Sequence, residues 1–378
     1  MRRRFSKALA TLLILLQFSY LIPQVLSDNY GGSYELLQHT DGDKIYRLNI
    51  AVSQSLQDYY TEKSHTTDSE NDFAKFVTPY ALKPIADCLA EIYSDDEDYT
   101  NGVLMIVHQI PYEVTVPSKY PVETIVDDKG DCDLLSYIAA SILEAHGLDV
   151  VLFYYESEAH MNIGVNLSHT PNDARGSAFY ITDNNIRYYM AECTGGEWET
   201  GWRVGDCPDE LKHASAQVVT LENCEQSAPG QVSASYKSLM NSTMSLTASP
   251  TYLIQGNSVT LSGQLSPVSQ NATVTIYIKT NSSPWAELVV VTTDSSGRFT
   301  YTWVPEDSGI GYVRASWSGN DYYAGADSQT QALTVISVFF VALLGCMLFL
   351  VVVGIAVFLI SRKTTQEVPA PQPPEVSS

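Results

Sequence analysis

Residues 121–165, PVETIVDDKGDCDLLSYIAASILEAHGLDVVLFYYESEAHMNIGV, decide the fold of the first half of this chain. From Asp133 to His146 the apolar residues fall on one helical stripe, and Gly147 follows where a C-terminal cap belongs. Two β-rich runs follow, at 150–155 and 160–165. A helix that leads into consecutive strands predicts an α+β domain.

Cys132 opens the predicted helix, directly after Lys129-Gly130-Asp131. The free N–H groups of a first helical turn and the helix dipole favour a negative charge, and therefore the thiolate, which is the nucleophilic form of cysteine. Gly130 permits a sharp turn into the helix. A buried structural or disulfide-bonded cysteine is the alternative interpretation of Cys132.

His160 begins a predicted strand, and its side chain is expected on the face opposite to Met161 and Ile163. A histidine on that face, downstream of a helix headed by cysteine, is typical of Cys-His enzymes, in which a third group orients the imidazole. Glu192 ends the predicted strand 186–192 and is our candidate for that third group. Asp183, in the predicted hairpin turn, is the rival candidate.

Three segments together resemble the transglutaminase-like superfamily of papain-like fold: YPVETIVDDKGDCDLLSYIAASILEAHGLDVVLFYY, HMNIGV and YYMAECTGGEWETGWRVGD. VLMIVHQIPYEV also resembles the segment that precedes the nucleophile in microbial members, so the resemblance covers roughly residues 44–210. It implies Cys132 as nucleophile, His160 as base and Glu192 as orienting acid, although many members have Asp at the third position. It also implies Gln109 or Tyr112, with the N–H of Cys132, as oxyanion donors.

The C-terminal part of the external chain has a different pattern. A Ser-, Ala- and Gly-rich stretch at 226–242 predicts a linker after the first domain, 28–225. Short β-rich runs separated by Gly and Ser turns fill 243–334 and predict a β-sandwich. Within it, GRFTYTWVPEDSGIGYVRASWSGNDYY resembles the immunoglobulin-like repeats of prokaryotic, especially archaeal, surface proteins.

Two apolar segments predict the compartment. Residues 1–27 have the basic start, apolar run and small-residue end of a secretory signal peptide. Residues 335–360 carry no charge and are long enough to cross a bilayer, and Arg362 and Lys363 follow. The positive-inside rule places the tail, 361–378, in the cytoplasm and residues 28–334 outside the cell.

The formal net charge of -22 argues against nucleic acid as a partner, because phosphate binding needs clustered Lys and Arg. We expect the partners to be the bilayer, through one helix, and a protein or peptide substrate at the cell surface. No cofactor is expected. No metal site is expected either, because the cysteines lack zinc spacing and the acidic run Asp95 to Asp98 lacks calcium-loop spacing and predicts a solvated turn.

An extracellular location also permits disulfide bonds between cysteines and glycans on asparagines. Disulfides persist outside the cell, and the Gly-rich loop between Cys193 and Cys207 indicates these two as a possible pair, with Cys132 left free. Four Asn-x-Ser/Thr triplets are possible glycosylation sites. They lie at Asn166, Asn241, Asn271 and Asn281.

These observations support two functional hypotheses. In the first, the chain is a surface cysteine enzyme that transfers an acyl group through a thioester on Cys132 to an amine (transamidation) or to water (amide or peptide hydrolysis). In the second, it is a non-enzymatic adhesion or envelope protein that uses the same fold as a binding platform. The sequence does not choose between amine and water, because that choice depends on how the cleft admits each of them.

Overall fold

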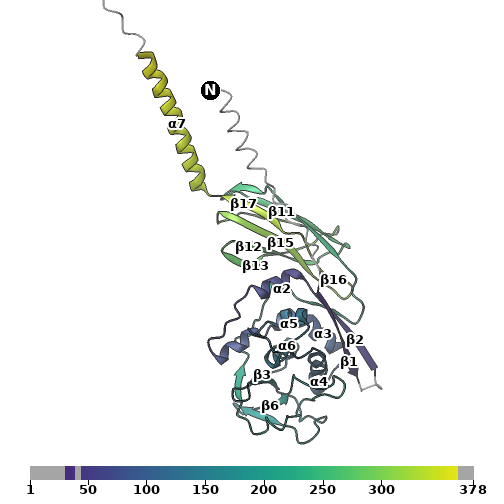
Figure 1. The fold of residues 1–378 in the computed structure, drawn as a ribbon. Helices are drawn as coiled ribbons and strands as arrows, with labels where there is room; N and C mark the ends of the chain where they lie inside the picture. Colours follow the sequence, from purple (N-terminus) through teal and green to yellow (C-terminus); the bar gives the residue numbers. More distant parts are fainter. Residues whose placement is uncertain (1–29, 39–43, 365–378) are drawn as a thin grey trace, which may run out of the picture.

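The computed structural model describes residues 30–38 and 44–364, with side chains up to residue 360. Over this range the protein is a mixed α+β structure with several antiparallel sheets and one long apolar C-terminal helix (Figure 1). The predicted signal peptide, 1–27, and most of the predicted cytoplasmic tail lie outside the described residues.

The N-terminal unit packs helices against two sheets. One sheet has the strand order β1-β2-β8 and the other β5-β6-β4-β3-β7. The helices are α2 (Gln54–Thr61), the 3-10 helix η1 (Glu70–Phe76), α3 (Pro79–Ile92), α4 (Asp96–Val107), α5 (Pro121–Asp127) and α6 (Cys132–His146). The strands are β1 (Tyr30–Gln38), β2 (Lys44–Val52), β3 (Val150–Tyr155), β4 (His160–Val165), β5 (Tyr180–Asp183), β6 (Ile186–Ala191), β7 (Gln217–Thr220) and β8 (Ser233–Ser235).

Helix α6 forms as predicted and is the centre of this unit. Its residues Leu134 to Leu143 are all buried, and Gly147 caps its end with a φ of 97°, which glycine adopts without strain. The strands β3 and β4 pair antiparallel in the predicted ranges. Alternate residues of β3 face two different cores, Leu152 the main helical core and Phe153 the core on the other face of the sheet. The register therefore fixes which face of β4 carries the polar side chains.

The C-terminal unit is a sandwich of two sheets around one core. The sheets have the orders β14-β11-β9 and β10-β17-β15-β12-β13, with β16 paired to β15. Their strands are β9 (Thr243–Ser249), β10 (Tyr252–Ile254), β11 (Val259–Ser266), β12 (Thr273–Thr280), β13 (Ser283–Thr292), β14 (Arg298–Trp303), β15 (Gly309–Gly319), β16 (Ala324–Asp327) and β17 (Gln331–Ile336).

Two expectations from sequence are corrected here. The acidic run is no solvated turn: Asp95 caps α4 through hydrogen bonds from the N–H groups of Glu97 and Asp98, and the Glu97 side chain is buried. Carboxylates in a first helical turn are stabilised by the helix dipole. The expected linker, 226–242, contains β8, which pairs with β2, so this stretch belongs to the sheet of the N-terminal unit.

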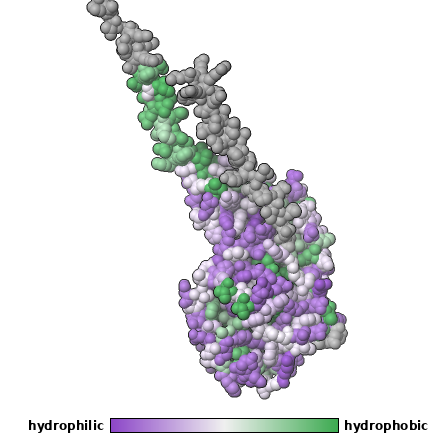
Figure 2. All heavy atoms as spheres, in the orientation of Figure 1, coloured by the Kyte–Doolittle hydropathy of each residue, from purple (hydrophilic) through white to green (hydrophobic). Residues whose placement is uncertain are grey.

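Helix α7 (Val338–Thr364) contains 23 residues, Val338–Ile360, with a mean hydropathy of 3.1, and none of this span is buried against the rest of the protein. Figure 2 shows its surface as a hydrophobic rod beside a mostly hydrophilic body. At 1.5 Å per residue the span is about 35 Å long, enough for the roughly 30 Å hydrocarbon core of a bilayer. By length and composition, α7 can be a single membrane span.

Candidate active site

Cys132, the predicted nucleophile, is the first residue of α6 and follows a short β-bridge at Gly130. Asp131 is the N-cap residue, and Gly130 pairs with Tyr112 in an isolated parallel bridge. A Cβ on Gly130 would lie 3.0 Å from the side chains of Leu134 and Thr124, so glycine keeps this turn close to the helix. Cys132 is a partly exposed free thiol. The thiol is therefore reachable from solvent at the positive end of the helix dipole.

His160 and Glu192 meet beside this thiol. The Nε2 atom of His160 lies 2.9 Å from the Oε2 atom of Glu192, whose side chain is only 1% exposed. The imidazole also lies close enough to Cys132 for this side chain to raise its pKa. Because Nε2 binds the carboxylate, Nδ1 is the ring nitrogen left for the thiol. The three predicted residues are thus brought together in the order thiol, imidazole, carboxylate.

The protonation of the imidazole follows from these contacts. Burial alone would lower the pKa of His160, but the neighbouring Cys132 and the hydrogen-bonded, negatively charged Glu192 outweigh burial and raise that pKa to about 10. Burial alone would raise the pKa of Glu192, but the bond to His160 and further bonds from Thr194 and Asn162 keep it below its ordinary value. Glu192 is therefore the ionised partner of a protonated imidazole.

Two residues that we did not assign hold Glu192 in place. Asn162 Nδ2 donates to Oε2 at 3.0 Å, and both the N–H and the hydroxyl of Thr194 donate to Oε1, at 2.9 and 2.5 Å. Asn162 could have been found from sequence, since it shares the face of β4 with His160. Thr194 had a weaker signal, the Glu-Cys-Thr order at the end of β6. Behind them, His108 Nε2 contacts the backbone carbonyl of Glu192 at 3.0 Å.

The rival acid and one oxyanion candidate lie elsewhere. Asp183 is the last residue of β5, next to the hairpin turn that leads into β6, and accepts a hydrogen bond from Asn184. Gln109 is corrected as an oxyanion candidate, because its amide is committed to backbone groups: it accepts from the N–H of Glu35 and donates to the carbonyls of Glu35 and Met105, each at 2.8 Å. Tyr112 remains beside the site, where burial and the nearby Cys132 raise the pKa of its phenol.

A cavity of about 310 Å³ opens on the imidazole side of the site. Besides His160 and Glu192 it is lined by Trp202, Glu158 and Glu210 among others, and no Lys or Arg belongs to its lining. Among the described residues the side chains of Glu158 and Glu210 have no hydrogen-bond or ion-pair partner. A second cavity of about 750 Å³ shares Trp202 and Glu210 with the first, so a wider groove continues from the site.

The possible disulfide between Cys193 and Cys207 is not formed. All six cysteines, which lie within the described residues, are free thiols. The Cys193 thiol is buried in the main helical core and points to the carbonyl of Ala191, whereas Cys207 packs against the core on the other face of the sheet. The two side chains thus belong to different layers.

The four candidate glycosylation sites differ in how open they are. Asn241, Asn271 and Asn281 are exposed in turns or next to strand ends of the sandwich. Asn166 is half-buried, and its Nδ2 already donates to the carbonyl of Arg187 at 3.0 Å. A glycan at Asn166 would replace one hydrogen of that donor.

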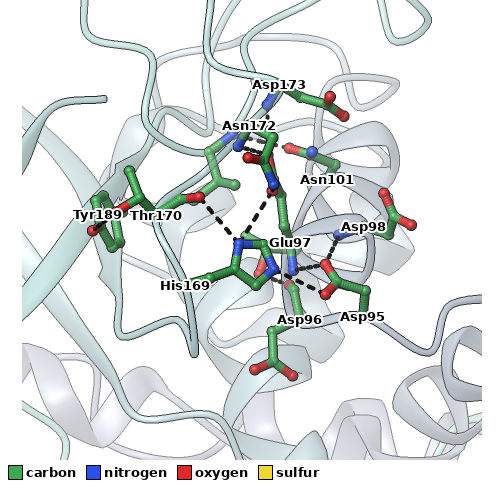
Figure 3. A network of polar contacts seen from close by, with 12 residues as sticks. Asp95, Asp96, Glu97, Asp98, Asn101, His169, Thr170, Asn172, Asp173 and Tyr189 are labelled. Atoms are coloured by element: carbon green, nitrogen blue, oxygen red, sulfur yellow. Dashed lines mark hydrogen bonds and ion pairs between the residues drawn. The ribbon is translucent and has the colours of Figure 1, made fainter. Parts of the chain in front are cut away.

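Asp95, Glu97 and His169 are the one group of possible metal ligands among the described residues, with ligand atoms within 4.8 Å of one another (Figure 3). Their hydrogen bonds favour a different role. His169 Nε2 faces Asp95 Oδ2 at 2.9 Å, and Nδ1 faces the carbonyl of Thr170 at 3.1 Å. Two acceptors require two ring protons, and the pKa of His169 is raised to about 9, first by the bond to Asp95. A protonated ring has no lone pair for a metal.

Glu97 completes this arrangement from the buried side. Its Oε1 accepts hydrogen bonds from the backbone N–H groups of Asn172 and Asp173, both at 2.7 Å. The cluster therefore fastens the loop after β4 to the start of α4 (Figure 3).

Comparisons with known proteins assign no family. No family model and no curated protein matches the chain. Solved structures with partial similarity include a chitin-binding domain from Burkholderia pseudomallei (14% identity, 23% of this chain and 55% of that chain, TM-score 0.18) and an AA10 LPMO from Photorhabdus luminescens (12%, 23% and 58%, TM-score 0.19). An engineered protein matches at 13% identity over 24% of this chain and 20% of its own, with a TM-score of 0.19. This chain thus covers less than two thirds of each, and scores this low carry no argument about fold or function.

Proposed function

We propose that this protein is a membrane-anchored, external cysteine enzyme of transglutaminase-like type, which transfers acyl groups through a thioester on Cys132. The observation that carries the proposal is the imidazole of His160, which is paired with the buried carboxylate of Glu192 and lies beside Cys132 at the start of α6. A cysteine at the start of a helix, packed on an antiparallel sheet that bears the histidine, is also the layout of the papain-like fold. The two-sheet unit is the immunoglobulin-like domain of the proposal.

The reaction follows from this geometry in two steps. The Cys132 thiolate attacks the carbonyl carbon of a carboxamide, a C–S bond forms, and the C–N bond breaks as the His160 imidazolium gives its proton to the leaving nitrogen. In the second step an amine or water gives a proton to His160 and attacks the thioester, so that the C–S bond breaks and the thiolate returns. Glu192 keeps the imidazole oriented and stabilises its positive form.

As the thiolate attacks, negative charge develops on the carbonyl oxygen of the substrate. Hydrogen-bond donors near the start of α6 are needed to stabilise it. The N–H of Cys132 is one of the unpaired donors of a first helical turn. The hydroxyl of Tyr112 is the second candidate, since its phenol lies close enough to Cys132 to respond to its charge. We therefore assign the oxyanion site to these two groups.

The lining of the cavity beside His160 indicates which molecule, an amine or water, accepts the acyl group. Glu158 and Glu210 line the cavity without a hydrogen-bond or ion-pair partner among the described residues, whereas the Trp202 ring already has the Arg175 guanidinium 5.7 Å from its centroid. Two carboxylates favour a positively charged group over a neutral one. Transamidation to a primary amine is therefore the form of the reaction to test first, and hydrolysis is the second.

The test is mass spectrometry of the external part of the chain incubated with a glutamine peptide and a cationic primary amine. The proposal expects a product in which the peptide gains the amine and loses ammonia, or, for hydrolysis, the free acid or a cleaved peptide. The Cys132→Ala variant is the matched control and should give none of these. Absence of every product, with an unreactive Cys132, would instead support the adhesion or envelope protein that uses this fold as a binding platform.

A further inference from the structure

The connection between the sandwich and α7 leaves almost no room between protein and bilayer. Strand β17 ends at Ile336 and α7 begins at Val338, so Ser337 alone separates them. Its hydroxyl accepts a hydrogen bond from the N–H of Phe339 at 3.2 Å, and its carbonyl accepts one from Val341 at 3.1 Å. Ser337 therefore caps the helix and is no flexible hinge.

One residue spans at most about 3.5 Å, whereas the headgroup layer on each side of the hydrocarbon is about 5–8 Å thick. Since the apolar span begins at Val338, the end of β17 must lie within that layer when α7 crosses a bilayer. Every other segment at the same height along the bilayer normal as Ile336 then lies in the headgroup layer too.

The segments at that level carry exposed apolar side chains. Ile254 pairs with Ile336, and Ile310 pairs with Thr334, two residues earlier. Val304 begins the loop that leads into Gly309, and the Gln255 side chain donates to Glu306 in that loop. The exposed fractions of Ile254, Val304 and Ile310 are 37%, 48% and 43%. We call Ile254, Val304, Ile310 and the loop 304–309 the membrane-facing end.

A cavity of about 640 Å³ opens at this end and supplies its chemistry. Trp303, Ile310 and Val335 give it an apolar lining, and Glu306 and Asp307 lie at the same place. Tryptophan is enriched where bilayers meet water. The two carboxylates repel anionic headgroups and attract the ammonium group of a zwitterionic lipid.

The sheet of the sandwich that contains β12, β13 and β15 is locked to the N-terminal unit through α2 and the residue after it. Arg314, whose side chain is 6% exposed, binds Asp58 at 2.9 Å and lies 4.6 Å from the ring of Trp285. Asp327 accepts the N–H of Ser55 at 3.2 Å. Glu62 accepts the N–H of Trp285 at 2.9 Å and pairs with Lys279. Figure 1 shows α2 at this junction and β6, which leads to Glu192, at the end far from α7.

We infer that the sandwich is a rigid pedestal whose membrane-facing end rests on zwitterionic lipid and holds the cleft away from the bilayer. This inference does not depend on the chemistry at Cys132. It predicts that the cleft receives substrates from outside and not from the surface of its own membrane. A protein lying on its side would instead use another exposed apolar group, Tyr112, Val114 and Val116, which are 57%, 71% and 89% exposed beside the nucleophile.

The test uses the full chain in phosphatidylcholine nanodiscs that contain a photoreactive phosphatidylcholine, with adducts mapped by peptide mass spectrometry. We expect adducts on α7, on 252–255 and on 303–310, and none on 112–116. Adducts confined to α7 would mean that the sandwich stands clear of the lipid, and adducts on 112–116 would mean that the protein lies down. Either result overturns the inference.

Variants distinguish the contribution of apolar side chains to lipid contact from that of the two carboxylates. Val304→Ser with Ile310→Ser should lose adducts on 303–310, while Val290→Ser, at a 46% exposed position on β13, should not. Anionic nanodiscs should reduce the same adducts, and Glu306→Gln with Asp307→Asn should restore them. Equal labelling in both lipids would refute the assignment to zwitterionic headgroups.

Discussion

Replacing Glu192 by Gln tests how the imidazole is oriented. In the wild type, both carboxylate oxygens accept: Oε2 from His160 and Asn162, and Oε1 from Thr194. A Gln amide has one oxygen and one NH₂ group. If the oxygen stays with Thr194, the NH₂ group faces two donors, and His160 must turn its Nε2 into an acceptor. The proton then sits on Nδ1, the nitrogen left for the thiol, and the ring can no longer accept one there.

The magnitude follows from the bonds that are lost. A hydrogen bond to a charged group contributes about 1.5–3 kcal/mol, and about 1.4 kcal/mol corresponds to a tenfold change in rate. Losing the bond between His160 and the carboxylate should therefore slow reaction at Cys132 roughly 10- to 150-fold, and the wrong tautomer adds to that loss. The effect should stay smaller than that of His160→Ala, which removes the base.

The assay is the rate of Cys132 alkylation by iodoacetamide across pH, followed by peptide mass spectrometry. The wild type should react rapidly at neutral pH, because the pKa of His160 near 10 keeps the imidazolium beside the sulfur. In Glu192→Gln that pKa falls, so the rate at neutral pH should drop toward that of an ordinary thiol. Glu156→Gln, an exposed position in the turn before β4, is the control. A folded Glu192→Gln protein with an unchanged rate and pH profile would refute the reasoning.

Three further changes test other parts of the structure. His169→Gln should lower the melting temperature near pH 6 and have little effect near pH 10, because a raised histidine pKa stabilises the fold below about 6.5 and loses that effect as pH rises through about 9; equal effects at both pH values would contradict the charged pair with Asp95. Gly164→Ala should cost about 1–3 kcal/mol in urea unfolding, since its Cβ would lie 2.3 Å from the ring of Phe153; a neutral result would mean that the ring moves freely. Cys132→Ser should melt like the wild type yet form no acyl-enzyme, and a large loss of stability would indicate a structural thiol.

Sequence periodicity predicted the parts of the site that depend on one element at a time. The apolar stripe and Gly147 defined α6, and the alternation from His160 to Val165 defined the polar face of β4. The meeting of Cys132, His160 and Glu192 was predicted because each begins or ends its own predicted element. Thr194 was missed as a donor because its role depends on a turn after β6, where no periodic pattern applies.

The predictions from sequence were wrong where a segment far away in the chain forms hydrogen bonds with the residue concerned. Gln109 looked available in the sequence, but β1, which lies far away in the chain, binds its amide. Glu97 looked solvated, but the loop at 172–173 supplies two N–H donors that make its burial favourable. The stretch 226–242 has the composition of a linker, and only the backbone pairing of β8 with β2 makes it part of a sheet. Such pairings have no local signal in the sequence.

The most direct test of the central claim is to trap the thioester. The external part of the chain is incubated with a glutamine peptide in the absence of amine, quenched in acid and mapped by mass spectrometry, before and after hydroxylamine. The account predicts a hydroxylamine-sensitive adduct on Cys132, with the mass of the peptide less ammonia, that is lost in His160→Ala and absent from Cys207. No adduct on a folded, reduced protein, or equal adducts on Cys207 and Cys132, would contradict it.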